Sequence, residues 1–101
     1  MSNGNRLLDK VALITGAGSG IGLETARLFA SEGARVAIVD IDADAASAAK
    51  EEITAGGGQA LALIADVSCD GDCARMVADT EATFGALHVM FNNAGISHID
   101  D

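Results

Sequence analysis

The sequence predicts an α/β fold built on a parallel sheet. Half of the 101 residues are hydrophobic, and short apolar runs alternate with longer segments in which apolar residues recur every three or four positions. Glycines mark most of the boundaries between these segments. A strand, a helix and a further strand in succession usually form a right-handed crossover between parallel strands. We therefore expect four parallel strands and three helices, with helices on both faces of the sheet.

The first strand and the first helix are predicted on either side of a glycine-rich loop. Val11–Thr15 is an unbroken apolar run, which is typical of a strand buried on both faces. Helical spacing begins at Ile21, and Gly33 stops this helix after Ser31. We expect the apolar face of the helix to contain Ile21, Thr25, Leu28 and Phe29.

The second strand is predicted over Arg35–Asp40, because four apolar residues lie inside this segment and an acidic residue ends it. Asp42 is expected to cap an Ala-rich helix over Ala43–Thr54, which the three glycines at 56–58 end. The small Ala side chains predict that this helix packs closely on its neighbours.

The third strand is predicted over Ala60–Ala65, and Ser68 is the expected N-cap of the helix that follows. Gly85 ends that helix, and the fourth strand is predicted over Leu87–Phe91. The apolar positions of the helix recur at spacings of three and four: Cys73, Met76, Val77, Thr80 and Phe84.

The charge of the chain excludes one large class of partner. The 15 acidic residues outnumber the 6 basic ones, which gives a net charge of -9. This charge repels a phosphate backbone, so we expect no nucleic-acid partner. Asp70 and Asp72 fall in the predicted first turn of the third helix, where a carboxylate interacts favourably with the helix dipole.

We also expect no membrane partner and no metal. The longest apolar stretches, such as Ala60–Ala65, are far shorter than the roughly 20 residues of a spanning helix. Residues 1–10 lack the apolar core of a signal peptide, so we expect a cytoplasmic protein in which Cys69 and Cys73 stay reduced. Two thiols without a nearby His or third Cys do not complete a tetrahedral metal site.

The segment at 15–22, TGAGSGIG, carries the main functional signal. Glycines let the backbone approach a ligand, and the free amides and dipole at the start of a helix attract an anion such as a pyrophosphate. The dinucleotide spacing GxGxxG is absent, because the positions that would complete it hold Ile21 and Leu23. No Lys followed by Ser or Thr closes the loop, which disfavours a P-loop triphosphatase.

Two other glycine spacings fit the loop, and the loop alone leaves both open. Gly16, Gly18 and Gly20 match the GxGxG of Rossmann-like methyltransferases. Thr15 and the glycines at 16, 20 and 22 match TGxxxGxG. Either spacing predicts a phosphate-containing ligand at the start of the first helix.

Four ordered motifs show that the sequence closely resembles the short-chain dehydrogenase/reductase family. They are TGAGSGIG at 15–22, Asp40 after the second strand, Asp66 and Val67 after the third, and NNAG at 92–95. The resemblance spans residues 8–96 and implies a Rossmann-type doubly wound sheet. Such a sheet usually has six or more strands, so we expect residues 1–101 to be the N-terminal part of a single NAD-binding domain. The remainder of the domain would lie outside these residues.

Asp40 is the residue that predicts NAD as the cofactor. It lies roughly 20 residues beyond the glycine loop, at the end of the adjacent strand, where a carboxylate accepts hydrogen bonds from ribose hydroxyls and repels a 2'-phosphate. Ser19 and Ile41 stand where members of the resembled family that use NADP tend to carry Arg or Lys. The predicted cofactor-binding residues are Gly16, Gly18, Ser19, Gly20, Ile21, Gly22, Asp40, Ile41, Asp66, Val67, Asn93, Ala94 and Gly95.

The resemblance also implies individual roles in the second half of the chain. Asp66 would accept from the adenine amino group and the Val67 amide would donate to a ring nitrogen, although Asp66 could instead cap the next helix. Asn93 is expected near the adenine ribose, and the small residues at 94 and 95 would allow the backbone to approach the cofactor. Asn92 is expected to bridge strands rather than bind the cofactor.

The resemblance implies an NAD-dependent oxidoreductase that interconverts a secondary alcohol and a ketone, and commonly a homo-oligomer, a tetramer. The family uses a Tyr, a Lys, a Ser and an Asn for catalysis. This sequence contains no Tyr, and Lys10 and Lys50 are its only lysines, so we predict no catalytic residue in this chain and expect it to be inactive alone. The alternatives are a methyltransferase that binds the ribose of S-adenosylmethionine through Asp40, which NNAG disfavours, and a noncatalytic dinucleotide sensor.

Overall fold

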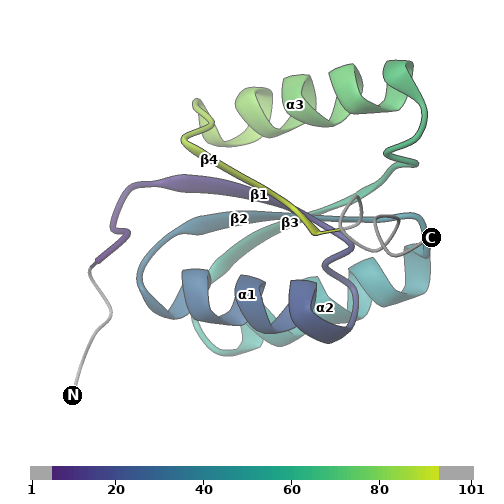
Figure 1. Ribbon diagram of the computed structural model, residues 1–101. Coiled ribbons are helices and arrows are strands. Elements are labelled where there is room, and N and C mark those ends of the chain that lie inside the picture. The colour runs from purple at the N-terminus through teal and green to yellow at the C-terminus, as the bar shows by residue number, and fades with distance from the viewer. Residues whose placement is uncertain (1–5, 94–101) are drawn as a thin grey trace.

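The computed structural model describes residues 6–93, which form a four-stranded parallel sheet covered by helices on both faces (Figure 1). The strand order is β3-β2-β1-β4, and α1 and α2 cover one face while α3 covers the other (Figure 1). This confirms the predicted α/β, Rossmann-like class. The elements are β1 (Val11–Thr15), α1 (Gly20–Ser31), β2 (Arg35–Asp40), α2 (Ala43–Ala55), β3 (Gln59–Ile64), α3 (Asp70–Phe84) and β4 (Val89–Asn92).

The strand order reverses at β1, between the neighbouring strands β2 and β4. From β1 the chain moves outward to β2 and β3 and then returns to place β4 on the other side of β1. Thr15, at the end of β1, is in register with Val39 of β2 and with Asn92 of β4, so the carboxyl ends of these strands meet. Ligands of doubly wound sheets bind outside such a meeting point, where the order of strands reverses.

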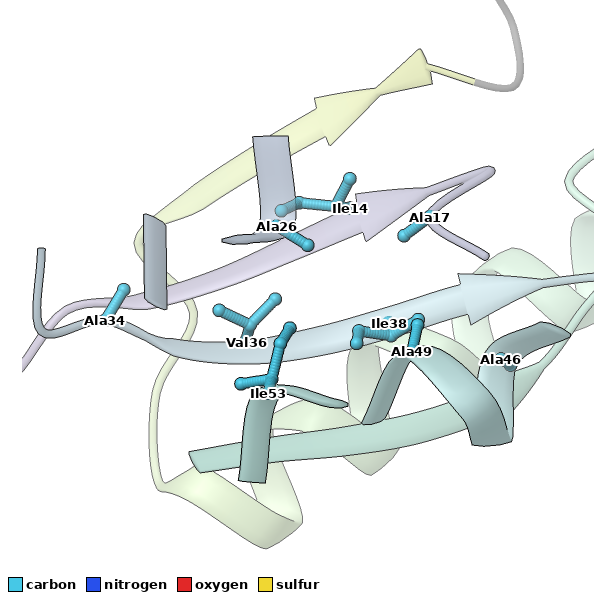
Figure 2. Close-up of a cluster of buried hydrophobic side chains, with 9 residues drawn as sticks. All are labelled: Ile14, Ala17, Ala26, Ala34, Val36, Ile38, Ala46, Ala49 and Ile53. Carbon is cyan, nitrogen blue, oxygen red and sulfur yellow. The ribbon is translucent and has the colours of Figure 1, made fainter. Parts of the chain in front are cut away.

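The core between the sheet and the α1–α2 layer uses small helix residues. Figure 2 shows the branched side chains of β1 and β2 pointing toward Ala side chains of both helices. Ala46 and Ala49 of α2 are buried, which confirms the close packing predicted for this helix. The cluster consists of Ile14, Ala17, Ala26, Ala34, Val36, Ile38, Ala46, Ala49 and Ile53.

A second core lies between the sheet and α3. Leu13, Val39 and Met76 pack there, and Met76 is 1% exposed. Thr80, one turn after Met76, is also buried, and its hydroxyl donates to the Met76 carbonyl oxygen at 2.7 Å. The hydroxyl is therefore satisfied inside its own helix, which makes its burial tolerable.

The face of α1 that packs on the sheet differs from the prediction. Ile21 is 71% exposed and Leu28 is 56% exposed, whereas Gly22 and Ala26 are buried. The prediction was wrong for Ile21 and Leu28 because it followed residue size, whereas Phe29 does pack against the core. Small residues at 22 and 26 allow the helix to approach the glycine loop and the sheet closely, which turns the larger residues at 21 and 28 outward.

The ends of the other elements lie within two residues of the prediction. Asp42 caps α2, because its carboxylate accepts from the Ala45 amide at 3.1 Å. Strand β4 begins at Val89 rather than at Leu87, whose side chain packs against the α3 core. Within residues 6–93, no helix combines the length and the apolar character that crossing a membrane requires.

Candidate functional site

The glycine loop turns the chain sharply from β1 into α1. Gly16 has a φ of 62° and Gly20 has a φ of 59°, in the left-handed region that favours glycine. The Ala17 amide donates to the Val39 carbonyl at 3.1 Å, which ties the loop to β2. A Cβ on Gly22 would overlap the Gly16 carbonyl oxygen, so the start of α1 lies directly against the loop.

Asp40 connects this loop to the turn after β2. One carboxylate oxygen accepts from the Gly18 amide at 2.9 Å, and the other accepts from the Asp42 amide at 3.0 Å. A Cβ on Gly18 would lie 2.8 Å from the Asp40 carboxylate and 2.6 Å from the Ala45 Cβ, so this position fits only glycine. Each carboxylate oxygen has a second lone pair, so Asp40 retains acceptor capacity for a ligand hydroxyl.

Asn92, the last residue of β4, and Asn93, which follows it, have different partners. The Thr15 hydroxyl donates to the Asn92 side-chain oxygen at 2.9 Å, which confirms that Asn92 bridges strands. The Asn93 side-chain nitrogen donates to the Gly16 carbonyl at 3.4 Å, so Asn93 contacts the glycine loop. Ala94 and Gly95, also predicted to line the site, lie outside the described residues.

The loop after β3 reaches the same edge of the sheet. The Ala65 amide donates to the Asp40 backbone carbonyl at 3.2 Å, which places Asp66 and Val67 one strand further from β1. The Ser68 amide and hydroxyl both donate to the same Asp66 carboxylate oxygen, at 2.9 and 2.6 Å. Ser68 was predicted to be the N-cap of α3, and this prediction was wrong. Cys69 is the N-cap residue, and its side chain makes no capping bond.

Asp72, in the first turn of α3, contacts this loop, although the sequence predicted for it only an interaction with the helix dipole. Its carboxylate accepts from the Asp66 backbone amide at 2.9 Å and pairs with Arg75 at 3.3 Å. In a capping box the acidic side chain at the third helical position accepts from the amide of the N-cap residue, whereas Asp72 reaches three residues beyond the N-cap Cys69.

The charges of the loop are negative at neutral pH. The Ser68 hydroxyl, and then the Ser68 amide, hold the pKa of Asp66 below its ordinary value. The Asp66 amide, and then Arg75, lower the pKa of Asp72 in the same way. Two ionised carboxylates at this end of β3 favour a ligand that donates hydrogen bonds there and repel an anion. An anion is favoured instead near the start of α1, where the helix dipole is positive.

The described residues that were predicted to bind the cofactor thus lie along the edge of the sheet formed by the carboxyl ends of its strands. Asp40 is hydrogen-bonded to the glycine loop at Gly18, and Asn93 is hydrogen-bonded to it at Gly16. Ile41, like Ile21, is largely exposed at the rim of this edge.

Comparison with known proteins identifies the family. The family model described as short chain dehydrogenase matches residues 10–101. The chain belongs to the short-chain dehydrogenase/reductase family. It is 50% identical over 92 residues to a cyclohexanol dehydrogenase of Acinetobacter sp. (strain SE19), a match that covers 91% of this chain and 37% of the relative. It is 47% identical over 91 residues to tropinone reductase-like 1 of Erythroxylum coca, covering 90% of the chain and 32% of the relative.

Solved structures of short-chain dehydrogenases have the same fold. A hydroxysteroid dehydrogenase from Escherichia coli matches 91% of this chain with a TM-score of 0.86 and 39% identity, over 39% of its own length. A 7α-hydroxysteroid dehydrogenase in complex with NADH and 7-oxo glycochenodeoxycholic acid matches 87% of the chain with a TM-score of 0.84 and 39% identity, over 34% of its own length. The chain therefore spans about a third to two fifths of the length of these short-chain dehydrogenases.

Proposed function

We propose that this chain is the NAD-binding part of an oxidoreductase that interconverts a secondary alcohol and a ketone. The similar curated proteins carry the names of dehydrogenases and reductases, and one similar structure contains NADH together with a 7-oxo compound. Residues 1–101 form the N-terminal part of a single NAD-binding domain in this proposal. Further strands, the catalytic Tyr and Lys, and the assembly into a homo-oligomer belong to residues beyond them, and the protein is cytoplasmic.

The position of Asp40 carries the choice of NAD. Its carboxylate lies beside the glycine loop and accepts a hydrogen bond from the Gly18 amide at 2.9 Å. In the proposed complex it also accepts hydrogen bonds from the hydroxyls of the adenine ribose. A 2'-phosphate on that ribose would bring a second negative charge against the carboxylate. Ser19 and Ile41, the neighbours from the loop and from the turn after β2, carry no positive charge to compensate for it.

Residues at the same edge of the sheet make the remaining contacts with the cofactor in this proposal. The first-turn amides of α1, which include those of Gly20, Ile21 and Gly22, have no partner within the helix and hold the pyrophosphate. Asp66 accepts from the adenine amino group, and the Val67 amide donates to the adenine ring. The cofactor, once bound, accepts or supplies the hydride of the reaction.

Titration of the full-length protein with NADH and NADPH, followed by fluorescence, tests the proposal. We expect wild type to bind NADH at least tenfold more tightly than NADPH, and the double variant Asp40→Ser with Ile41→Arg to reverse the preference. Asp44→Ser is the matched control for the loss of the Asp40 charge, because Asp44 is an exposed acid in the first turn of α2 and its removal changes the charge by the same amount as Asp40→Ser alone. An affinity ratio unchanged in the double variant overturns the role of Asp40. Binding of S-adenosylmethionine in place of either dinucleotide supports the methyltransferase alternative.

A further inference from the structure

Several hydrogen bonds hold the loop between β3 and α3. The Cys69 amide donates to the Asp66 carbonyl at 2.9 Å, and Ser68 donates twice to the Asp66 carboxylate. The Ala65 amide joins the start of the loop to Asp40. These bonds fix the backbone of Asp66 from within the loop and from the sheet.

Side chains of α3 hold the same loop from the other side. The Asp72 carboxylate accepts from the Asp66 amide at 2.9 Å. Arg75 lies 3.3 Å from the second Asp72 oxygen and donates to the Ile64 carbonyl at 2.9 Å, so it joins Asp72 to the end of β3. The Cys73 thiol donates to a carbonyl of the same loop, that of Val67, at 3.3 Å.

Asp72 acts on the loop rather than on its own helix. A capping carboxylate normally accepts from amides of the first helical turn. Asp72 instead accepts from an amide six residues earlier in the chain, and Cys69 leaves the helix without a side-chain cap. Asp70, in the same first turn, is exposed, and no hydrogen bond of its side chain to residues 6–93 is found. The two acids therefore differ in what they contact and share their relation to the helix dipole.

The orientation of the Asp66 carboxylate follows from these contacts. One of its oxygens is engaged by Ser68, so the other is the oxygen that can receive a donor from a ligand. An ionised carboxylate only accepts hydrogen bonds, so it fits the amino group of adenine and repels an oxygen at that place. The direction of this oxygen depends on the Asp66 backbone, which Asp72 holds.

We infer that Asp72, braced by Arg75, is a positioning residue that sets the selectivity of the site for adenine. The inference rests on the proposed function, since it concerns the base of the same dinucleotide. Without the Asp72 contact, Asp66 would still be present and ionised, but its amide would lose its acceptor and its backbone would be held less firmly. The protein would then distinguish poorly between adenine and a base with the opposite hydrogen-bond pattern.

Nicotinamide hypoxanthine dinucleotide in its reduced form is the probe that separates these effects. Hypoxanthine carries an oxygen where adenine carries its amino group, and a proton on the adjacent ring nitrogen, so both Asp66 and the Val67 amide would meet the wrong partner. An unpaired polar contact of this kind costs about a factor of ten in affinity. We expect full-length wild-type protein to bind NADH at least tenfold more tightly than the hypoxanthine analogue.

Asp72→Ala should reduce this ratio to about threefold or less, mainly through weaker binding of NADH. Asp72→Asn should keep most of the ratio, because its side-chain oxygen still accepts from the Asp66 amide. Asp70→Ala is the matched control and should keep the full ratio, because it removes the same charge from the same helical turn. Arg75→Met, at a side chain that is 47% exposed, should lower the ratio in part even if Asp72→Ala fails to fold.

The outcomes separate the two proposals. A purely structural role of Asp72 would weaken the binding of both dinucleotides by the same factor. An unchanged ratio of affinities in Asp72→Ala and in Arg75→Met would therefore overturn the inference. The proposed function would still stand in that case, because wild type would bind NADH. If wild type binds neither dinucleotide, the proposed function fails and the inference fails with it.

Discussion

Replacing Gly22 by Ala tests how closely α1 must approach the glycine loop. A Cβ at this position would overlap the Gly16 carbonyl oxygen and lie 2.8 Å from its carbonyl carbon and 2.9 Å from the Asn93 side-chain nitrogen. Two of these atoms belong to backbone, which cannot rotate away as a side chain can. Relief of the overlap therefore requires that α1 and the loop move apart.

The structure gives the size of the effect. Overpacking of a well-packed site costs about 1–3 kcal/mol, and contact with backbone places Gly22→Ala at the upper end, about 3 kcal/mol. Ala inside a helix is more favourable than Gly by up to about 1 kcal/mol, which leaves a net loss of about 2 kcal/mol. With a urea dependence of about 2 kcal/mol per molar, the unfolding midpoint should fall by about 1 M.

Urea unfolding of full-length protein, followed by circular dichroism, measures this shift. Gly71→Ala is the matched control, because Gly71 lies in α3 and a Cβ there would meet no atom within 4 Å. We expect this control to unfold at the same or a slightly higher urea concentration than wild type. Equal midpoints for the two variants would refute the argument that close approach, rather than helix propensity, requires glycine at position 22.

Two further predictions concern the packing and the charges that hold the helices. Met76→Ala should lower the free energy of unfolding by about 2–5 kcal/mol in urea titrations, whereas Met76→Leu should cost less than about 1.5 kcal/mol, because Met76 is fully buried and Leu preserves its volume. The exposed ion pair between Arg27 of α1 and Glu52 of α2 lowers the pKa of Glu52 below its ordinary value of 4.5, mainly through the Arg27 hydrogen bond. A lowered folded-state pKa means that the pair contributes fully above the unfolded-state pKa of Glu52 and is lost as the pH falls through the folded-state pKa. Glu52→Gln should therefore flatten the acid limb of a plot of stability against pH below the ordinary Glu pKa of 4.5, and an identical limb would contradict this.

The fold was largely predictable from local patterns, because buried parallel strands such as Val11–Thr15 are continuous apolar runs and glycines interrupt them. The rotation of α1 was not predictable from hydrophobicity. It depends on a close contact between Gly22 and the loop, in which the absence of a side chain is what matters. Periodicity favours large apolar residues and so selected Ile21 and Leu28, which are exposed.

The place of a site residue was predictable where its position in the sequence alone indicates it, and less so where hydrogen bonds between residues determine it. Asp40 could be found from its distance to the glycine loop, and its carboxylate does lie beside Gly18. The bond from the Asp66 amide to Asp72 connects a loop to a helix turn, so neither residue alone indicated it. Ser is a common N-cap residue, but the Ser68 hydroxyl donates to the Asp66 carboxylate and does not cap α3.

The bond between Asp40 and the Gly18 amide has a consequence for protein engineering. In the proposed function, a single side chain here would discriminate between cofactors, and the same side chain holds the loop that would receive them. Substitutions that remove the whole carboxylate, such as Asp40→Ala, would leave the Gly18 amide without its acceptor, and the gain in tolerance for a 2'-phosphate would be offset by a less ordered loop. Redesign toward NADP should therefore start from residues that retain an oxygen acceptor at position 40, such as Asn or Ser, before any positive charge is introduced nearby.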